Sequence, residues 1–147
     1  MSNEDDIKAL NLLEKAVHKA EESLTQTKYF QPFLMLLTDT GKIEIYENEE
    51  TDSTKSYASL EEILRKRIKN GDVDIMILAV DTVIPDRFVK DISSGIRLHL
   101  EEKSQKYKDI SGRFIYVPYE LCQIKDKEIF VRLHAPIPVG FPAEYIA

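Results

Sequence analysis

The stretch SGIRLHLEE places Arg97, His99 and Glu101 at alternate positions, so their side chains share one face of a predicted strand. A histidine in such company could transfer protons or bind a ligand. Tyr116 lies in the following predicted strand. The pattern favours an exposed or partly covered histidine that makes cross-strand contacts. The alternative is a ligand-binding set formed by Arg97, His99 and Tyr116.

The remaining histidines and the single cysteine are spread along the chain. His18 lies in a predicted helix and His134 in a late strand, and no HxH, HExxH or CxxC motif occurs. Cys122 could meet His134 across a hairpin, and a reactive thiolate needs such a neighbour, but a structural cysteine is the commoner case. We therefore predict no metal site and no catalytic residue.

Nucleotide-binding signatures are also missing from the sequence. The five glycines are scattered, so neither GxGxxG nor GxxxxGK[ST] can be formed. Neighbouring carboxylates such as Glu101 and Glu102 point apart on a strand and indicate charged surface. No cofactor is predicted.

Composition limits the class of protein. The 147 residues are 43% hydrophobic and 31% charged, as expected for one globular domain, 1–147, with a core at about 4–134. A net charge of −6 argues against sequence-blind nucleic-acid binding, and the basic run RKRIK is predicted to be a solvated helix face. The acidic N-terminus is unlike a signal peptide and no apolar run would span a membrane. With one cysteine, a cytoplasmic location is expected.

Hydrophobic spacing predicts two helices. The first covers residues 4–27, and the second begins at a capping Ser56 or Ser59 and continues through Asn70. The buried stripe predicted for the first helix consists of Ile7, Leu10, Leu13, Val17, Ala20 and Leu24.

The strands follow from apolar runs and alternation. The run at 33–37 and the alternating segment at 43–46 form a hairpin, and the run at 75–80 forms a central strand. An irregular excursion at 85–95 precedes strands at 95–102, 113–120 and 128–134. This order predicts an α+β fold: a single antiparallel sheet of five to six strands with both helices on one face.

The tail, residues 135–147, contains three prolines and several apolar residues without a partner in the predicted core. Proline cannot donate to a strand ladder, so we expect extended chain across the surface. We predict a protein interface there, formed by Ile137, Val139, Phe141 and Tyr145. The aromatic segment FIYVPY is open to two interpretations, core or interface.

Four segments together resemble a widespread group of small uncharacterised bacterial α+β proteins: PFLMLLTDTGKIEIYE, IMILAVDTVIP, GIRLHLEE and FIYVPYE. The resemblance covers roughly residues 30–120 and implies no established activity. The chain departs from the group's pattern at Ser94-Gly95 and at Glu102. The element order is also similar to profilin-like and roadblock-type scaffolds, which mostly serve as dimeric adaptors.

These observations favour a non-enzymatic protein that binds another protein, either as an immunity or antitoxin-like protein or as a homodimeric adaptor. Small acidic α/β domains often neutralise basic toxins. The alternative is a small-molecule-binding protein or enzyme with a pocket near Arg97 and His99.

Overall fold

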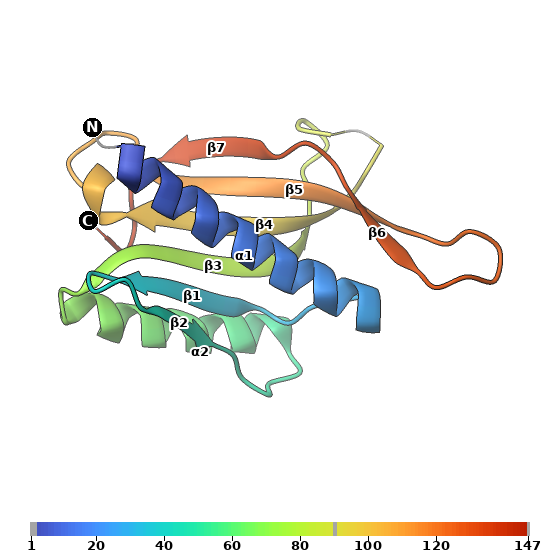
Figure 1. Ribbon diagram of the computed structural model, residues 1–147, viewed down its shortest axis with the longest axis horizontal. Helices are drawn as coiled ribbons and strands as arrows, with labels where there is room; N and C mark the ends of the chain where they lie inside the picture. The colour runs from blue at the N-terminus through green and yellow to red at the C-terminus, as the bar shows by residue number, and fades with distance from the viewer. Residues whose placement is uncertain (1–2, 90, 147) are drawn as a thin grey trace.

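The computed structural model describes residues 3–89 and 91–146 and shows one antiparallel sheet with a helix on each side (Figure 1). The strand order is β2-β1-β3-β4-β5, with β6 and β7 both paired to β5. The α+β class and the element order are confirmed, and the described residues include one strand more than predicted. Neither described helix is long and apolar enough to cross a membrane. The elements are α1 (Asn3–Thr27), β1 (Phe33–Thr38), β2 (Ile43–Tyr46), α2 (Ser53–Lys69), β3 (Val73–Val83), β4 (Ser94–Glu102), the 3₁₀ helix η1 (Lys103–Gln105), β5 (Gly112–Cys122), β6 (Phe130–Leu133) and β7 (Ile137–Phe141).

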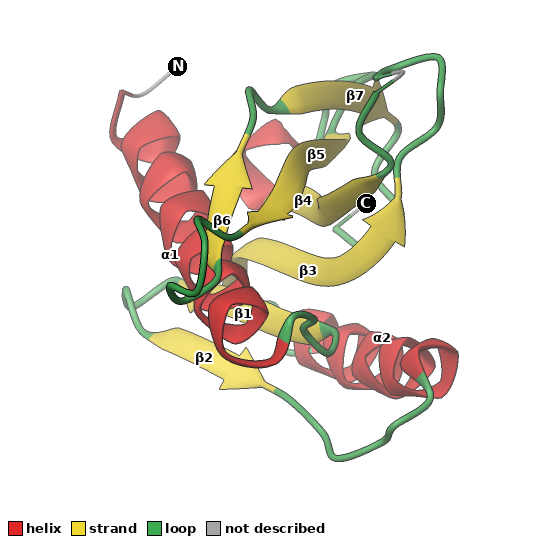
Figure 2. Cartoon of the chain, turned by 90° about the vertical axis from the view of Figure 1, so that its right-hand side faces the viewer, coloured by secondary structure: helices red, strands yellow, loops and turns green. Residues whose placement is uncertain are grey.

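The two helices lie on opposite faces of the sheet (Figure 2). On β1, Phe33 and Met35 face α1, whereas Leu34 and Leu36 face α2. The prediction that both helices share one face is therefore wrong. Its physical reason was present in the sequence: a strand that is apolar on both sides must be covered on both sides.

The face that α1 buries differs from the predicted one. Small side chains dominate the contact, which lets the helix axis lie close to the sheet. Ile7 and Leu10, placed in the core by the sequence pattern, are each 56% exposed. The buried stripe consists of Ala9, Leu12, Ala16, Ala20 and Leu24, so the prediction is confirmed only for Ala20 and Leu24.

Asp52 caps α2, because its carboxylate accepts hydrogen bonds from the backbone amides of Thr54 (2.9 Å) and Lys55 (3.2 Å). The prediction of Ser56 or Ser59 as the cap is wrong. Ser56 is fully buried inside the first turn, where its hydroxyl donates to Asn48 Oδ1 at 2.8 Å.

We expect Asp52→Ala to lower the free energy of unfolding by about 1 kcal/mol, because two amides in the first turn lose their acceptor. Urea denaturation followed by circular dichroism measures the change. Thr51→Ala, one residue earlier and outside the helix, is the matched control and should leave stability unchanged. Equal losses in the two variants would contradict the assigned cap.

The tail is extended, as predicted, but residues 137–141 are also paired with the sheet as β7, which was not predicted. β6 pairs with residues 119–122 of β5, and β7 pairs with residues 112–116 of the same strand. Between them the His134 amide donates to the Pro118 carbonyl at 2.9 Å. β6 and β7 together thus form one interrupted edge strand along β5. Gly112 makes room for it, because a Cβ there would lie 2.7 Å from the Phe141 ring.

Candidate functional site

His99 lies on the face predicted for it, but it is buried and only 2% exposed. Its ring is surrounded by the rings of Phe114, Phe141 and Tyr145, each with its centroid 5.2 Å away. Nε2 donates to Glu101 Oε2 at 2.6 Å. The expectation of an exposed or partly covered histidine is therefore wrong, because the returning tail covers this part of the sheet.

Glu101 holds the end of the chain in place. Its two carboxylate oxygens accept the backbone amides of Glu144, Tyr145 and Ile146 at 2.8–2.9 Å. We call residues 143–146 the C-terminal clasp. Burial raises the pKa of Glu101, but the hydrogen bonds from His99 and the clasp amides outweigh burial and leave the pKa below its ordinary value. The hydrogen bonds of the Glu101–His99 pair thus hold the clasp against the sheet.

This pairing predicts a loss of stability in acid. A carboxylate with a lowered folded-state pKa contributes stability above its ordinary pKa of 4.5, and that stability is lost as pH falls through the folded-state value. We therefore expect the difference in unfolding free energy between wild type and Glu101→Gln to be constant above about pH 5 and to shrink below pH 4.5. Urea titrations at a series of pH values measure it. Because Glu61 and Glu144, near the clasp, are present in both proteins, their titration largely cancels and the difference reports on Glu101 together with its partner His99. A constant difference down to pH 2.5 would contradict this assignment.

The other two residues of the predicted ligand-binding set also contact neighbours within the chain. Arg97 Nη2 donates to the Tyr57 hydroxyl at 2.8 Å, and its guanidinium lies 4.4 Å from the centroid of Phe114. Tyr116 is 8% exposed and packs against Phe88, from the segment between β3 and β4. That segment, the predicted excursion, contains Lys90, which lies outside the described residues. Arg97, His99 and Tyr116 do share one face, and their ligand-binding role stays a prediction.

The predicted interface residues have neighbours in the chain as well. Phe141 and Tyr145 pack on His99, and Arg65 of α2 lies over the Tyr145 ring. Ile137 and Val139 are half-buried in β7. The sequence premise that these apolar side chains lack a partner is thus wrong, and the interface itself stays a prediction.

The remaining ionisable candidates do not converge. His134 pairs with Glu120 at 2.8 Å near the surface, and Cys122 lies opposite Phe130 in the ladder. His18 pairs with Glu22 on the exposed side of α1 at 3.0 Å. Within residues 3–89 and 91–146, no group of three or more His, Cys, Asp or Glu side chains could hold a metal ion.

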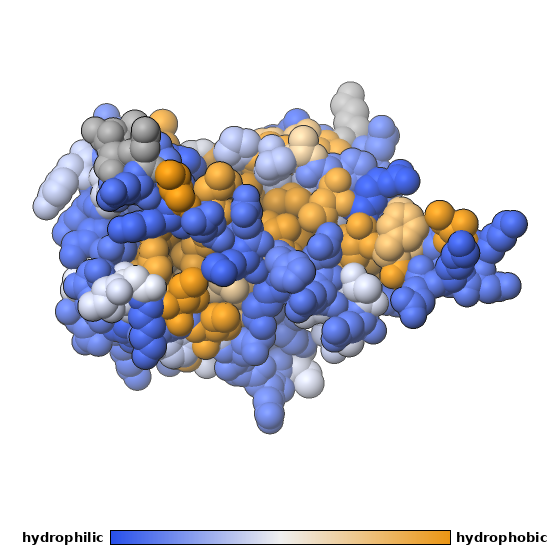
Figure 3. Space-filling model, in the orientation of Figure 1, coloured by the Kyte–Doolittle hydropathy of each residue, from blue (hydrophilic) through white to orange (hydrophobic). Residues whose placement is uncertain are grey.

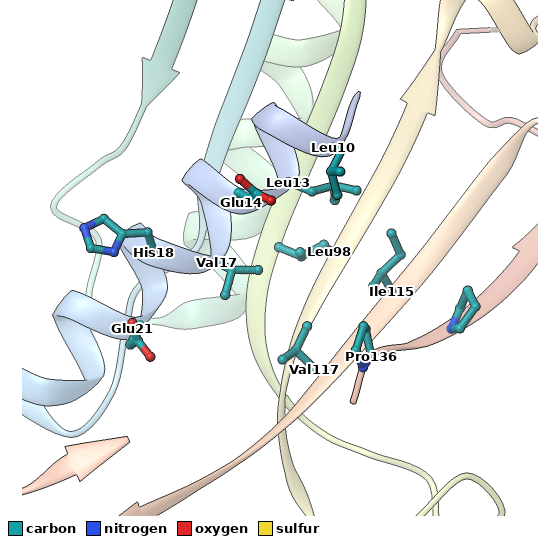
Figure 4. Close-up of a pocket in the computed structure, with 11 residues that line it drawn as sticks. Leu10, Leu13, Glu14, Val17, His18, Glu21, Leu98, Ile115, Val117 and Pro136 are labelled. Carbon is teal, nitrogen blue, oxygen red and sulfur yellow. The ribbon is translucent and has the colours of Figure 1, made fainter. Parts of the chain in front are cut away.

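A hollow of about 590 Å³ lies on the opposite face, between α1 and strands β4, β5 and β7. Its apolar side chains point toward one another from the helix and from the sheet (Figure 4). Hydrophobic surface is visible beside α1 in the same region (Figure 3). We call this hollow the α1–β5 groove. It is lined by Leu10, Leu13, Glu14, Val17, His18, Glu21, Leu98, Ile115, Val117, Pro136 and Pro138.

The groove exists because one helix cannot cover the sheet. Six strand positions at about 4.8 Å spacing span roughly 24 Å, whereas a helix is only about 10 Å wide. On the α2 face, the clasp and Phe88 cover the strands that α2 leaves open. On the α1 face, α1 packs over β1, β3 and β4, and its C-terminal part lies beside β6. The apolar side chains of β5 on that face, Ile115 and Val117, form the groove floor with Leu98.

Acidic side chains form the rim of the groove. Glu14 and Glu21 project from α1 along its length, and the His18 ring points away from the apolar side chains (Figure 4). Among the described lining residues there is no lysine or arginine. The groove can therefore bury apolar surface and attract positive charge beside it.

A second apolar stripe in the helix sequence indicates this groove. Leu10, Leu13 and Val17 continue a helical stripe directly beside the stripe of Ala9, Ala16 and Ala20. Two adjacent stripes make an apolar arc wider than one sheet contact needs. The prediction assigned Leu10, Leu13 and Val17 to the core, whereas they line the groove.

Comparisons of the chain with protein-family models, curated proteins and solved structures give no match. Two features of the structure, the groove and the clasp, bear on function. The clasp residues are bound to Glu101 of the same chain, whereas Leu10, Leu13, Val17 and Ile115 at the groove remain partly exposed.

Proposed function

We propose that this chain is a non-enzymatic cytoplasmic module that binds another protein through the α1–β5 groove. The observation that carries the proposal is the set of partly exposed apolar side chains along the groove, Leu10, Leu13 and Val17 of α1 and Ile115 of β5, beside a floor in which Leu98 and Val117 are already buried. Exposed apolar surface of this kind marks interaction sites on soluble proteins. Its burial against a partner would be favourable, and leaving it in water is not.

A binding role fits the chemistry of the groove better than catalysis does. The buried pair His99–Glu101 lies on the opposite face and is tied to the clasp. The ionisable groups at the groove, Glu14, His18 and Glu21, stand on its rim, and His18 is turned toward Glu22. An apolar floor without a convergent polar set suits recognition of an apolar surface.

The rim favours a foreign partner over a second copy. Two copies joined groove to groove would bring Glu14 and Glu21 of one α1 close to the same residues of the other, and like charges repel. A partner with positive charge beside its apolar surface avoids this cost. The arrangement suits an immunity or antitoxin-like protein that neutralises a basic partner.

Position-specific photo-crosslinking in producing cells tests the proposal. With p-benzoylphenylalanine at Leu10, which lines the groove, we expect a discrete adduct with another protein, lost when Val17→Lys is added. The same probe at Lys66, exposed on α2, is the control and should give none. Equal adducts at both positions, or none at Leu10, would overturn the proposal. An adduct of two copies of this chain would assign the groove to a homodimer instead.

A further inference from the structure

The α1–β5 groove has the length and walls of a helix-binding site. It runs beside α1 from Leu10 to Glu21, about 16 Å at 1.5 Å per residue, which matches three helical turns. One wall is a helix and the floor is the pleated face of β4 and β5 (Figure 4). A second helix lying on this face would pack beside α1 at the usual 8–10 Å between helix axes.

Addition of a strand is the main alternative, and the edge beside the groove is unsuited to it. Pro136, Pro138 and Pro142 lie along β7 and its flanks, and each lacks a backbone N–H. Prolines on an edge strand block pairing with another chain. A partner strand would find few donors there, whereas a helix satisfies its own backbone groups.

The charges beside the groove select the polar side of such a helix. A second hollow continues along α1 and shares Glu21, with Glu22, Phe130 and Val131 in its lining. No lysine or arginine is among the described residues that line either hollow. On β5, Arg113 lies on this face beyond the groove floor and interacts with Glu102. The helix is thus expected to carry apolar residues toward the groove and basic residues beside them.

We infer that the occupant of the groove is an amphipathic helix of about three turns, with lysine or arginine flanking its apolar stripe, from another protein. This inference rests on the proposed function and specifies the partner's chemistry. Three features carry it together: an apolar groove of helical length, an edge with few strand donors, and an acidic rim. Recognition of this kind uses apolar anchors at helical spacing, with charges that set the partner's identity.

Stapled peptides provide the test, since a free peptide of about 12 residues would be mostly unfolded. One peptide carries leucines on one face with lysines beside them, the second replaces the lysines by glutamates, and the third scrambles the leucine stripe. Fluorescence anisotropy measures their affinities for the intact chain. We expect the lysine peptide to bind at least about tenfold more tightly than the other two, and more weakly at high salt.

Reversing the charges of Glu14 and Glu21 tests whether the groove rim causes the preference for the lysine peptide. Glu14→Lys with Glu21→Lys should remove the preference for the lysine peptide, whereas Glu49→Lys with Glu62→Lys, the same charge change at exposed positions elsewhere, should retain it. Equal binding of the lysine and glutamate peptides would overturn the basic helix and leave the binding function standing. No peptide binding, with a crosslinked adduct at Leu10, would overturn the helix alone. No binding and no adduct would overturn both the helix and the binding function.

Discussion

Glu101→Ala is expected to lower the free energy of unfolding by about 3–5 kcal/mol, the largest effect of any single substitution considered. The carboxylate accepts four hydrogen bonds, from His99 Nε2 and from the amides of residues 144–146. Its removal leaves the buried donors of His99 and Ile146 and the part-buried amides of Glu144 and Tyr145 without an acceptor, and each unsatisfied buried donor costs about 1–3 kcal/mol. Without the Glu101 carboxylate, Tyr145 loses its backbone hydrogen bond and keeps the hydrogen bond from its hydroxyl to Glu61. Urea denaturation measures the loss.

The chain contains a matched control for this prediction. Glu120 pairs with His134 at a similar distance, 2.8 Å, but both side chains are substantially exposed. Glu120→Ala should change the free energy of unfolding by no more than about 1 kcal/mol. In Glu101→Ala the amides of residues 144–146 should also lose their protection against hydrogen exchange. Similar small losses in the two variants, with protection retained, would show that the clasp does not depend on Glu101.

The second large effect concerns binding. Val17→Lys is expected to weaken binding of the stapled lysine peptide at least about 100-fold, equivalent to about 2.7 kcal/mol. The lysine occupies space in the middle of the groove wall, removes apolar contact and places positive charge against a basic partner. Val17 is only half-buried, so the long side chain can extend toward water with modest loss of stability. Anisotropy gives the affinity, and urea denaturation checks that the variant is folded.

Leu10→Lys repeats the test at a more exposed position of the groove, where folding is less affected. Its control is Ile124→Lys: Leu10 is 56% exposed and Ile124 59% exposed, but Ile124 is outside the groove lining. We expect a loss of affinity at Leu10 and none at Ile124. If both lysine variants in the groove bound the peptide as tightly as wild type, the peptide would have to bind elsewhere.

Local patterns in the sequence were enough to predict the elements and the class of fold. Two strands are predicted by hydrophobic pattern alone: the apolar run from Phe33 to Leu37 and the alternation around His99. The turn at Gly41 predicts the hairpin that follows the first of them. Stripe spacing likewise specified both helices. These features depend on neighbours a few residues apart, which a single sequence displays directly.

The features that could not be predicted from the sequence depend on contacts between segments that are distant along the chain. His99 is buried because residues 141 and 145, more than forty positions later, return to cover it. The rotation of α1 depends on close packing of Ala16 and Ala20 against the sheet, and helical spacing fits either stripe. The groove follows from the width of the sheet relative to one helix, a property of the assembled layers. Arg97, His99 and Glu101 were placed on one face correctly, but their surroundings could not be predicted.

The most direct measurement is a methyl NMR titration of the intact chain with the stapled lysine peptide. We expect shift changes concentrated at Leu13, Val17, Ile115 and Val117, with the methyl groups under α2, such as Leu34 and Leu64, unchanged. The same titration of Val17→Lys should produce little change at any of these groups. Shift changes centred on the α2 face or the clasp, or saturable binding that leaves the groove methyl groups unaffected, would contradict the claim that the α1–β5 groove is the binding surface.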